Sequence, residues 1–313
     1  MKPFVGAVSL ALVTCVACFA QDFAVKDDGT RIEISELGQP VLTYIYRSAK
    51  SEGSAASPTQ QDSGYFHPVY GLYGEVLTGE SPSNWSGAPG IHWGWSRLGA
   101  GGKVVDLERG VGGRREFERV LREERTATGV RVALQNVWLA GSEDRAQVLE
   151  TLSFTVNPVV KAQRNIDVSI RLTNIAPDKI YLSGSMPGSG FTFTLNPERS
   201  DWSFSSGQSL VPTPDKPFLS PFLICSYRDD HRSSRSGIAI FQDARNPGYA
   251  QPNWLIETPE RMVAGVAEST KAELSPGDFL EFRYRFVITH LTGSAGEMTA
   301  EYAKFMAEGQ RRE

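Results

Sequence analysis

Apolar and polar residues alternate with a period of two along most of the chain from residue 23 onward. In Ile166–Thr173 and Leu280–Ile288 the apolar side chains occupy every second position. This spacing is typical of a β-strand with one face on a core and the other in water. Further segments read as strands between turn signals: Arg31–Ser35, Val41–Tyr46, Gly129–Ala140, Val148–Val156, Phe191–Leu195, Pro221–Tyr227 and Gly237–Gln242. The pattern predicts an all-β protein built from antiparallel strands.

Two segments show a spacing that a helix would also give. In Arg115–Ala127 the residues Phe117, Val120 and Leu121 fit either period, and we favour a strand there. Near the C-terminus the apolar residues recur at helical spacing behind a candidate N-cap at Ser294, which predicts one C-terminal helix. Its apolar positions are Met298, Tyr302, Phe305 and Met306.

No composition shift divides the chain into two parts. The polar stretch Ser51–Ser63 lies too close to the start to separate two cores, so we predict a surface loop within a single domain, 21–313. This many strands exceed a seven-stranded sandwich. They indicate a large two-sheet antiparallel sandwich, with the two sheets stacked face to face.

The first residues are typical of an export signal. A positive start at Lys2 precedes the apolar stretch Phe4–Ala20, which ends in small residues, so we expect a signal peptide over 1–20 with cleavage after Ala20. A lipoprotein signal with acylation at Cys18 is the alternative. The mature chain would be secreted or periplasmic, without a transmembrane segment, and its one cysteine, Cys225, is predicted to be a buried, inert thiol.

Charge narrows the choice of partner. The 32 basic and 36 acidic residues nearly balance, giving a formal net charge of −4. The broad basic surface that binds nucleic acid is therefore not expected. Composition leaves the oligomeric state open.

Aromatic residues concentrate between Tyr65 and Trp95. This segment carries seven aromatic residues within 31 positions, together with His67 and His92. Rings with a few polar neighbours form the stacking surface and hydrogen-bonding rim that a sugar needs. The alternative is that the same rings fill the core of the sandwich.

The motifs of this segment resemble those of a bacterial family labelled "methane oxygenase PmoA", a family of unknown function. The resemblance rests on Tyr65–Tyr70, Gly74–Thr78 and Gly90–Trp95, and it spans about Ile32–Phe305. Later matches are Asn136–Trp138, Gly237–Phe241, Asn246, Trp254 and Leu274–Asp278. By analogy, strand number and size suggest the supersandwich fold of galactose mutarotase.

One motif of that family is missing. Where the family carries Asp-His-x-His-His-Arg-Gly, this chain reads Asn84–Gly90 without a histidine. Only His67 carries over from the family's histidines. The four histidines, at 67, 92, 231 and 290, are too scattered for the clustered imidazoles that copper needs. A copper-dependent methane oxygenase is therefore not expected, and the residues predict no metal and no cofactor.

Three functions follow as hypotheses. The leading one is carbohydrate binding, or binding of another small amphipathic ligand, by a protein that has lost catalysis. A carbohydrate-active enzyme of hydrolase or epimerase type is the alternative, with His67 or Glu75 as the catalytic acid–base group. A cell-envelope interaction protein is the third. The candidate binding residues are Tyr65, Tyr70, Asn84, Trp85, His92, Trp93, Trp95, Arg245, Asn246 and Trp254.

Overall fold

The computed structural model describes most of the chain after residue 22. The described ranges are 23–47, 63–80, 89–107, 110–126, 128–141, 145–184, 186, 188–199, 201–207, 214–228, 235–266, 270–291 and 295–310. The predicted signal peptide, residues 51–62 of the predicted loop, Asn84, Trp85 and the candidate cap Ser294 lie outside them.

The first sheet has eight antiparallel strands. Its spatial order is β1 (Phe23–Asp27), β2 (Arg31–Glu36), β3 (Gln39–Ile45), β4 (Tyr65–Val69), β5 (Ile91–Gly94), β13 (Gly190–Thr194), β18 (Arg261–Gly265) and β17 (Trp254–Thr258).

The second sheet also has eight antiparallel strands and contains the longest ones. Its order is β14 (Ser203–Ser206), β15 (Phe222–Arg228), β16 (Arg235–Gln242), β20 (Phe279–Leu291), β11 (Gln163–Asn174), β10 (Arg145–Val156), β9 (Gly129–Ala140) and β8 (Gly113–Thr126). The ambiguous segment Arg115–Ala127 falls largely on β8, so the predicted strand is confirmed there.

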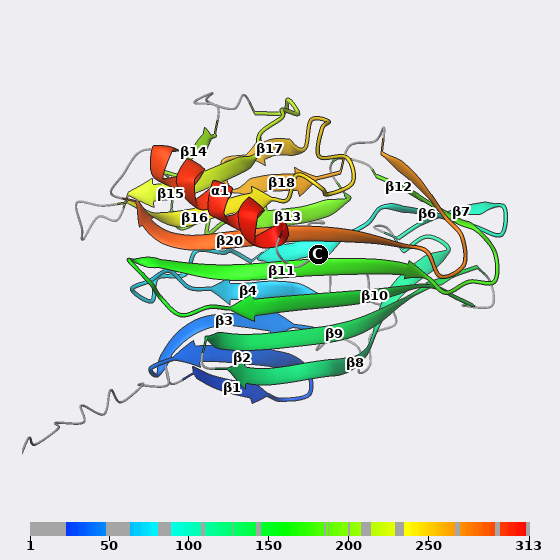
Figure 1. Ribbon diagram of the computed structural model, residues 1–313, viewed down its shortest axis with the longest axis horizontal. Helices are drawn as coiled ribbons and strands as arrows, with labels where there is room; N and C mark the ends of the chain where they lie inside the picture. Colours follow the sequence, from blue (N-terminus) through cyan, green and yellow to red (C-terminus); the bar gives the residue numbers. More distant parts are fainter. Residues whose placement is uncertain are drawn as a thin grey trace, which may run out of the picture.

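A third sheet of four short strands lies at one end of the molecule, as Figure 1 shows. It consists of β19 (Lys271–Leu274), β12 (Ile180–Ser183), β6 (Arg97–Ala100) and β7 (Lys103–Asp106). The sequence did not predict this sheet, because strands of four residues are too short to show a clear alternation.

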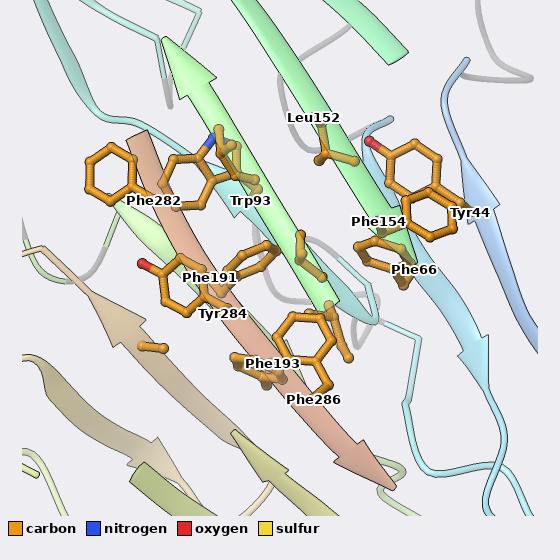
Figure 2. Close-up of a cluster of buried hydrophobic side chains, with 14 of the residues drawn as sticks. Tyr44, Phe66, Trp93, Leu152, Phe154, Phe191, Phe193, Phe282, Tyr284 and Phe286 are labelled. Carbon is orange, nitrogen blue, oxygen red and sulfur yellow. The ribbon is translucent and has the colours of Figure 1, made fainter. Parts of the chain in front are cut away.

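Aromatic rings fill the space between the two large sheets (Figure 2). Phe191 of β13 lies 4.9 Å from Tyr284 of β20, and Trp93 of β5 lies 5.2 Å from Phe282 of the same strand, measured between ring centroids. These contacts join the facing layers, and edge-on ring pairs add to what burial alone contributes. The predicted all-β, two-sheet sandwich is confirmed.

The predicted C-terminal helix is confirmed as α1 (Ala295–Gln310), which crosses the outer face of β15, β16 and β20 (Figure 1). Met298 and Phe305 are buried there against an apolar patch on the strands. That patch consists of Phe222, Ile224, Ala239, Phe241 and Val287. Among the described residues, none belongs to a helix that is both long and apolar enough to cross a membrane.

Cys225, on β15, is buried as predicted. Burial raises the pKa of its thiol well above the ordinary value. A buried thiol that keeps its proton is a weak nucleophile.

Candidate functional site

Three of the predicted ligand-binding tryptophans lie inside the sandwich. Trp93, Trp95 and Trp254 all have 0% exposure. The indole N–H of Trp254 donates to the carbonyl oxygen of Ser220 at 2.8 Å, and that of Trp95 to the carbonyl oxygen of Arg97 at 3.2 Å. An indole without exposed surface offers no face to a solute, so in this structure the three rings act as core residues.

Tyr65 and His92 face one another across β4 and β5. Tyr65 and His92 lie on the opposite face of the sheet from their neighbours Phe66 and Trp93, whose rings enter the core. His92 is 6% exposed and Tyr65 is half-buried. The structure therefore brings these two predicted residues together, with most of the imidazole covered.

The two predicted catalytic residues have different partners. Glu75 accepts hydrogen bonds from the hydroxyl of Ser236 and, at 3.0 Å, from the backbone N–H of Tyr73. His67 instead contacts Thr78 through its Nδ1 atom at 3.0 Å. No hydrogen bond joins Glu75 to His67 in the described part of the chain, so they do not form an acid–base pair here.

Arg245 and Asn246 lie at a groove of about 1050 Å³ on the outer face of the second sheet. The floor is formed by side chains of β8 to β11 and β20, and one wall by α1 and residues 243–246. In Figure 1 this is the face of the green strands beside α1. We call it the outer groove.

A row of register partners runs across the floor of the outer groove. Arg122, Ala133, Ser153, Ser169 and Arg283 lie opposite one another on five successive strands. Strands lie about 4.8 Å apart, so the row is about 19 Å long. Its three central side chains are small and its ends are arginines, which makes a trough with hydroxyl groups at its bottom.

A second row borders the trough. Arg131, Thr155, Asp167 and Arg285 are register partners on β9, β10, β11 and β20. Asp167 is paired with Arg285, whose Nε atom lies 2.6 Å from Oδ1. Arg131 has no ion pair among the described residues, and its exposed guanidinium therefore remains open to a ligand.

Asp243 fixes the wall of the outer groove. Its carboxylate accepts hydrogen bonds from Nε and Nη2 of Arg245 at 2.9 and 2.7 Å, and Arg283 Nη1 lies at 3.5 Å. Burial alone would raise the pKa of Asp243, but the hydrogen bonds of Arg245 and the charges of both arginines lower it. Asp243 is therefore an ionised anchor and a poor proton donor.

Asn246 joins this wall to the floor. Its side-chain amide donates to the carbonyl oxygen of Arg283 at 3.0 Å, and its carbonyl oxygen accepts from the backbone N–H of Arg283 at 2.8 Å. The loop after β16 is thus hydrogen-bonded to β20 as the strand β16 itself is. These bonds fix the backbone from which the Arg283 side chain extends at the end of the trough.

The end of α1 approaches the same cluster closely. A Cβ atom on Gly309 would lie 2.4 Å from Nη2 of Arg245 and 2.9 Å from Nη1 of Arg283. Only glycine allows this approach without displacing a guanidinium. On the same helix, Glu308 accepts a hydrogen bond from Arg285 at 2.7 Å, so α1 is held against the groove by charged groups.

His67 and Tyr70 line a different groove, of about 530 Å³, on the outer face of β1 to β4. We call it the His67 groove. Burial lowers the pKa of His67, and the nearby charge of Glu80 only partly offsets this effect. The imidazole is consequently neutral at pH 7.

Within the ranges that the structure describes, no three His, Cys, Asp or Glu side chains come together in a way that could hold an ion.

Sequence reasoning missed most of the outer groove. Arg122, Arg131, Ser153 and Ser169 occupy the polar positions of predicted strands, which indicates only that they face water. Local sequence patterns do not indicate which strands lie side by side.

Comparisons with known proteins concern the family and the fold. The model of a family of unknown function, DUF6807, matches residues 31–303. No curated protein matches the chain. The structure is similar to a putative aldose 1-epimerase from Klebsiella pneumoniae, with a TM-score of 0.42 and 11% identity over 91% of this chain and 89% of that one. It is also similar to a GalM/aldose epimerase homologue from C. elegans, with a TM-score of 0.36 and 9% identity over 87% and 100% of the two chains. At these values neither likeness assigns a reaction.

Proposed function

The chain belongs to the family of unknown function DUF6807, and we propose that this member binds a carbohydrate in the outer groove. The observation that carries the proposal is the row from Arg122 to Arg283, which places hydroxyl groups between two guanidinium groups on rigid strands. Sites built on strands hold their groups more precisely than sites on loops.

The charges of the outer groove favour a ligand with many hydroxyl groups. Four arginines and three carboxylates line it, so both signs are present and nearly balanced. A sugar hydroxyl donates to a carboxylate and accepts from a guanidinium, and it does both with serine or threonine. A polyanion would meet the carboxylates of Asp167 and Glu281 and is less well matched.

Binding without catalysis agrees best with the state of the acidic groups. The anchored carboxylate of Asp243 holds its charge, and both oxygens of Glu75 already accept hydrogen bonds. A hydrolase or epimerase needs a group that gives up a proton near neutral pH. We therefore place the enzyme hypothesis second.

The proposal includes export of the chain. The apolar stretch Phe4–Ala20 supports cleavage after Ala20, with acylation at Cys18 as the alternative. The intact mass of the protein recovered from the periplasm, the medium and the membrane fraction separates the two. Loss of residues 1–20 supports secretion, and a lipid-modified Cys18 at the new N-terminus would contradict it.

Binding is tested by calorimetry with cello-, malto-, xylo- and galacto-oligosaccharides. Ser169→Trp fills the middle of the trough, and Thr173→Trp places the same ring at another half-buried, outward-facing position of β11, outside the groove. We expect at least one sugar to bind, Ser169→Trp to weaken it at least tenfold, and Thr173→Trp to leave it unchanged. The proposal fails if no sugar binds, or if the two variants behave alike while both remain folded by circular dichroism.

A further inference from the structure

We propose that the His67 groove is a second binding site, which takes a sugar ring of monosaccharide size with one of its oxygens accepting a hydrogen bond from Nε2–H of His67. It lies on the first sheet, whereas the outer groove lies on the second (Figure 1). The two proposals therefore rest on different residues.

The size and lining of the His67 groove suit a small amphipathic ring. About 530 Å³ lies within the range of small-molecule sites. Ala24, Pro40, Ile45 and Pro68 supply apolar surface. A sugar ring needs such surface for its C–H face, together with polar groups at its edge.

The polar edge of the groove follows the strand register. Lys26, Glu33 and Thr43 are partners on β1, β2 and β3, and His67 lies on the next strand. Glu33 forms ion pairs with Arg31, whose Nε atom lies 2.9 Å away, and with Lys26, whose Nζ atom lies 3.7 Å away. The groove thus has cationic donors at one end and an imidazole at the other.

The hydrogen bonds of Thr78 determine which imidazole nitrogen carries the proton. Thr78 is 3% exposed, and its hydroxyl accepts a hydrogen bond from the backbone N–H of Val69 at 3.0 Å. Its other partner among the described residues is Nδ1 of His67, at 3.0 Å. A buried hydroxyl hydrogen needs an acceptor, and the Val69 N–H is itself a donor. The hydroxyl hydrogen therefore points to Nδ1.

This arrangement makes His67 a donor toward the ligand. With Nδ1 accepting from Thr78, the neutral ring carries its hydrogen on Nε2. Thr78 is a positioning residue, since it selects the tautomer and orients the ring without touching the ligand. The role differs from that of a general base, which needs an unprotonated nitrogen facing the substrate.

Nitrogen-15 NMR of the full-length mature protein at pH 7.5 tests both parts of the inference. His67→Phe identifies the His67 signals, which we expect to report the Nε2–H tautomer. Thr78→Val should give a mixture of tautomers and Thr78→Ser should keep the original one. A merely structural role of Thr78 would leave the tautomer unchanged.

The ligand arm uses the methyl glycosides of glucose, galactose, mannose and xylose as probes. At least one of these glycosides should shift the Nε2 signal of His67 in a saturable way. His67→Phe should weaken the affinity of the protein for that glycoside about tenfold, as expected for the loss of one hydrogen bond. Ser169→Trp should leave this response unchanged, which separates failure here from failure of the outer groove. A dominant Nδ1–H tautomer, or no shift with any of the four probes, would overturn the proposal.

Discussion

The outer face of the second sheet consists of two halves that meet at β20. Beneath α1 the outward side chains are apolar, as with Phe241 and Val287, and they are buried. Beyond the helix the outward side chains are polar, as with Ser169 and Arg283, and they line the outer groove. β20 contributes to both halves, only four residues apart. On β20, outward side chains are therefore core where α1 covers them, and they line the outer groove where it does not.

Arg285 marks the boundary between the two halves. Its guanidinium pairs with Asp167 on the polar side and with Glu308 on α1, and its Cζ atom lies 5.1 Å from the centroid of the Phe305 ring. The Arg285 side chain therefore contacts both the apolar face of α1 and the charged floor of the outer groove.

The largest predicted effect is a loss of stability when a buried ring of the covered half is removed. Phe305 is 3% exposed, and Phe305→Ala should lower the free energy of unfolding by about 3–5 kcal/mol because it removes a buried ring and leaves a cavity. In the open half, Ser153→Ala should change it by at most about 0.5 kcal/mol. Urea unfolding measures both variants. Equal losses would show that the two halves do not differ as described.

A smaller effect is expected at the boundary. Arg285→Met keeps a long side chain but leaves Asp167 without its ion-pair partner, and should lower the free energy of unfolding by about 2 kcal/mol. The matched control is Arg171→Met, because the guanidinium of Arg171 lies 3.6 Å from the centroid of the exposed Phe279 ring. That cation–π contact at the surface is worth about 0.5–1 kcal/mol. If Arg171→Met proved the costlier change in urea unfolding, Arg285 would not hold the two halves together.

The sequence predicts the covered half better than the open one. Period-two alternation places Ile166–Thr173 and Leu280–Ile288 in strands, and helical spacing places Phe305 on an apolar face, because both signals are local. The trough needs Ser169 beside Arg283, two residues more than 100 positions apart, whose pairing depends on the register of β11 and β20. Alternation indicates which face of a sheet a residue lies on, but it does not indicate which strand lies next to it.

In the aromatic segment Tyr65–Trp95 the sequence signal is clear, but it has two possible interpretations. Trp93 and Trp95 were predicted as ligand contacts because rings gather there, yet enrichment in rings is equally typical of a core, where the structure places both. His67 and Tyr70 of the same segment lie on a groove. Arg245 and Asn246, predicted from a polar cluster after a strand, lie on another. Residue type alone does not separate these cases, since exposure depends on the opposing sheet.

The smallest predicted effect is a pH dependence in the open half. The folded state lowers the pKa of Asp243 below the ordinary value near 4, so its stabilising contribution is fully present above about pH 4. As the pH falls through the lowered pKa, the folded protein must take up a proton that the unfolded chain already holds, and this contribution is lost. Asp243→Asn removes the carboxylate charge that pairs with Arg245 and Arg283, and should be less stable than the wild type at pH 7. Urea unfolding from pH 7 to pH 2.5 should show this difference narrowing below about pH 4. A difference that stayed constant over the whole range would mean that Asp243 does not carry the charge that anchors the wall of the outer groove.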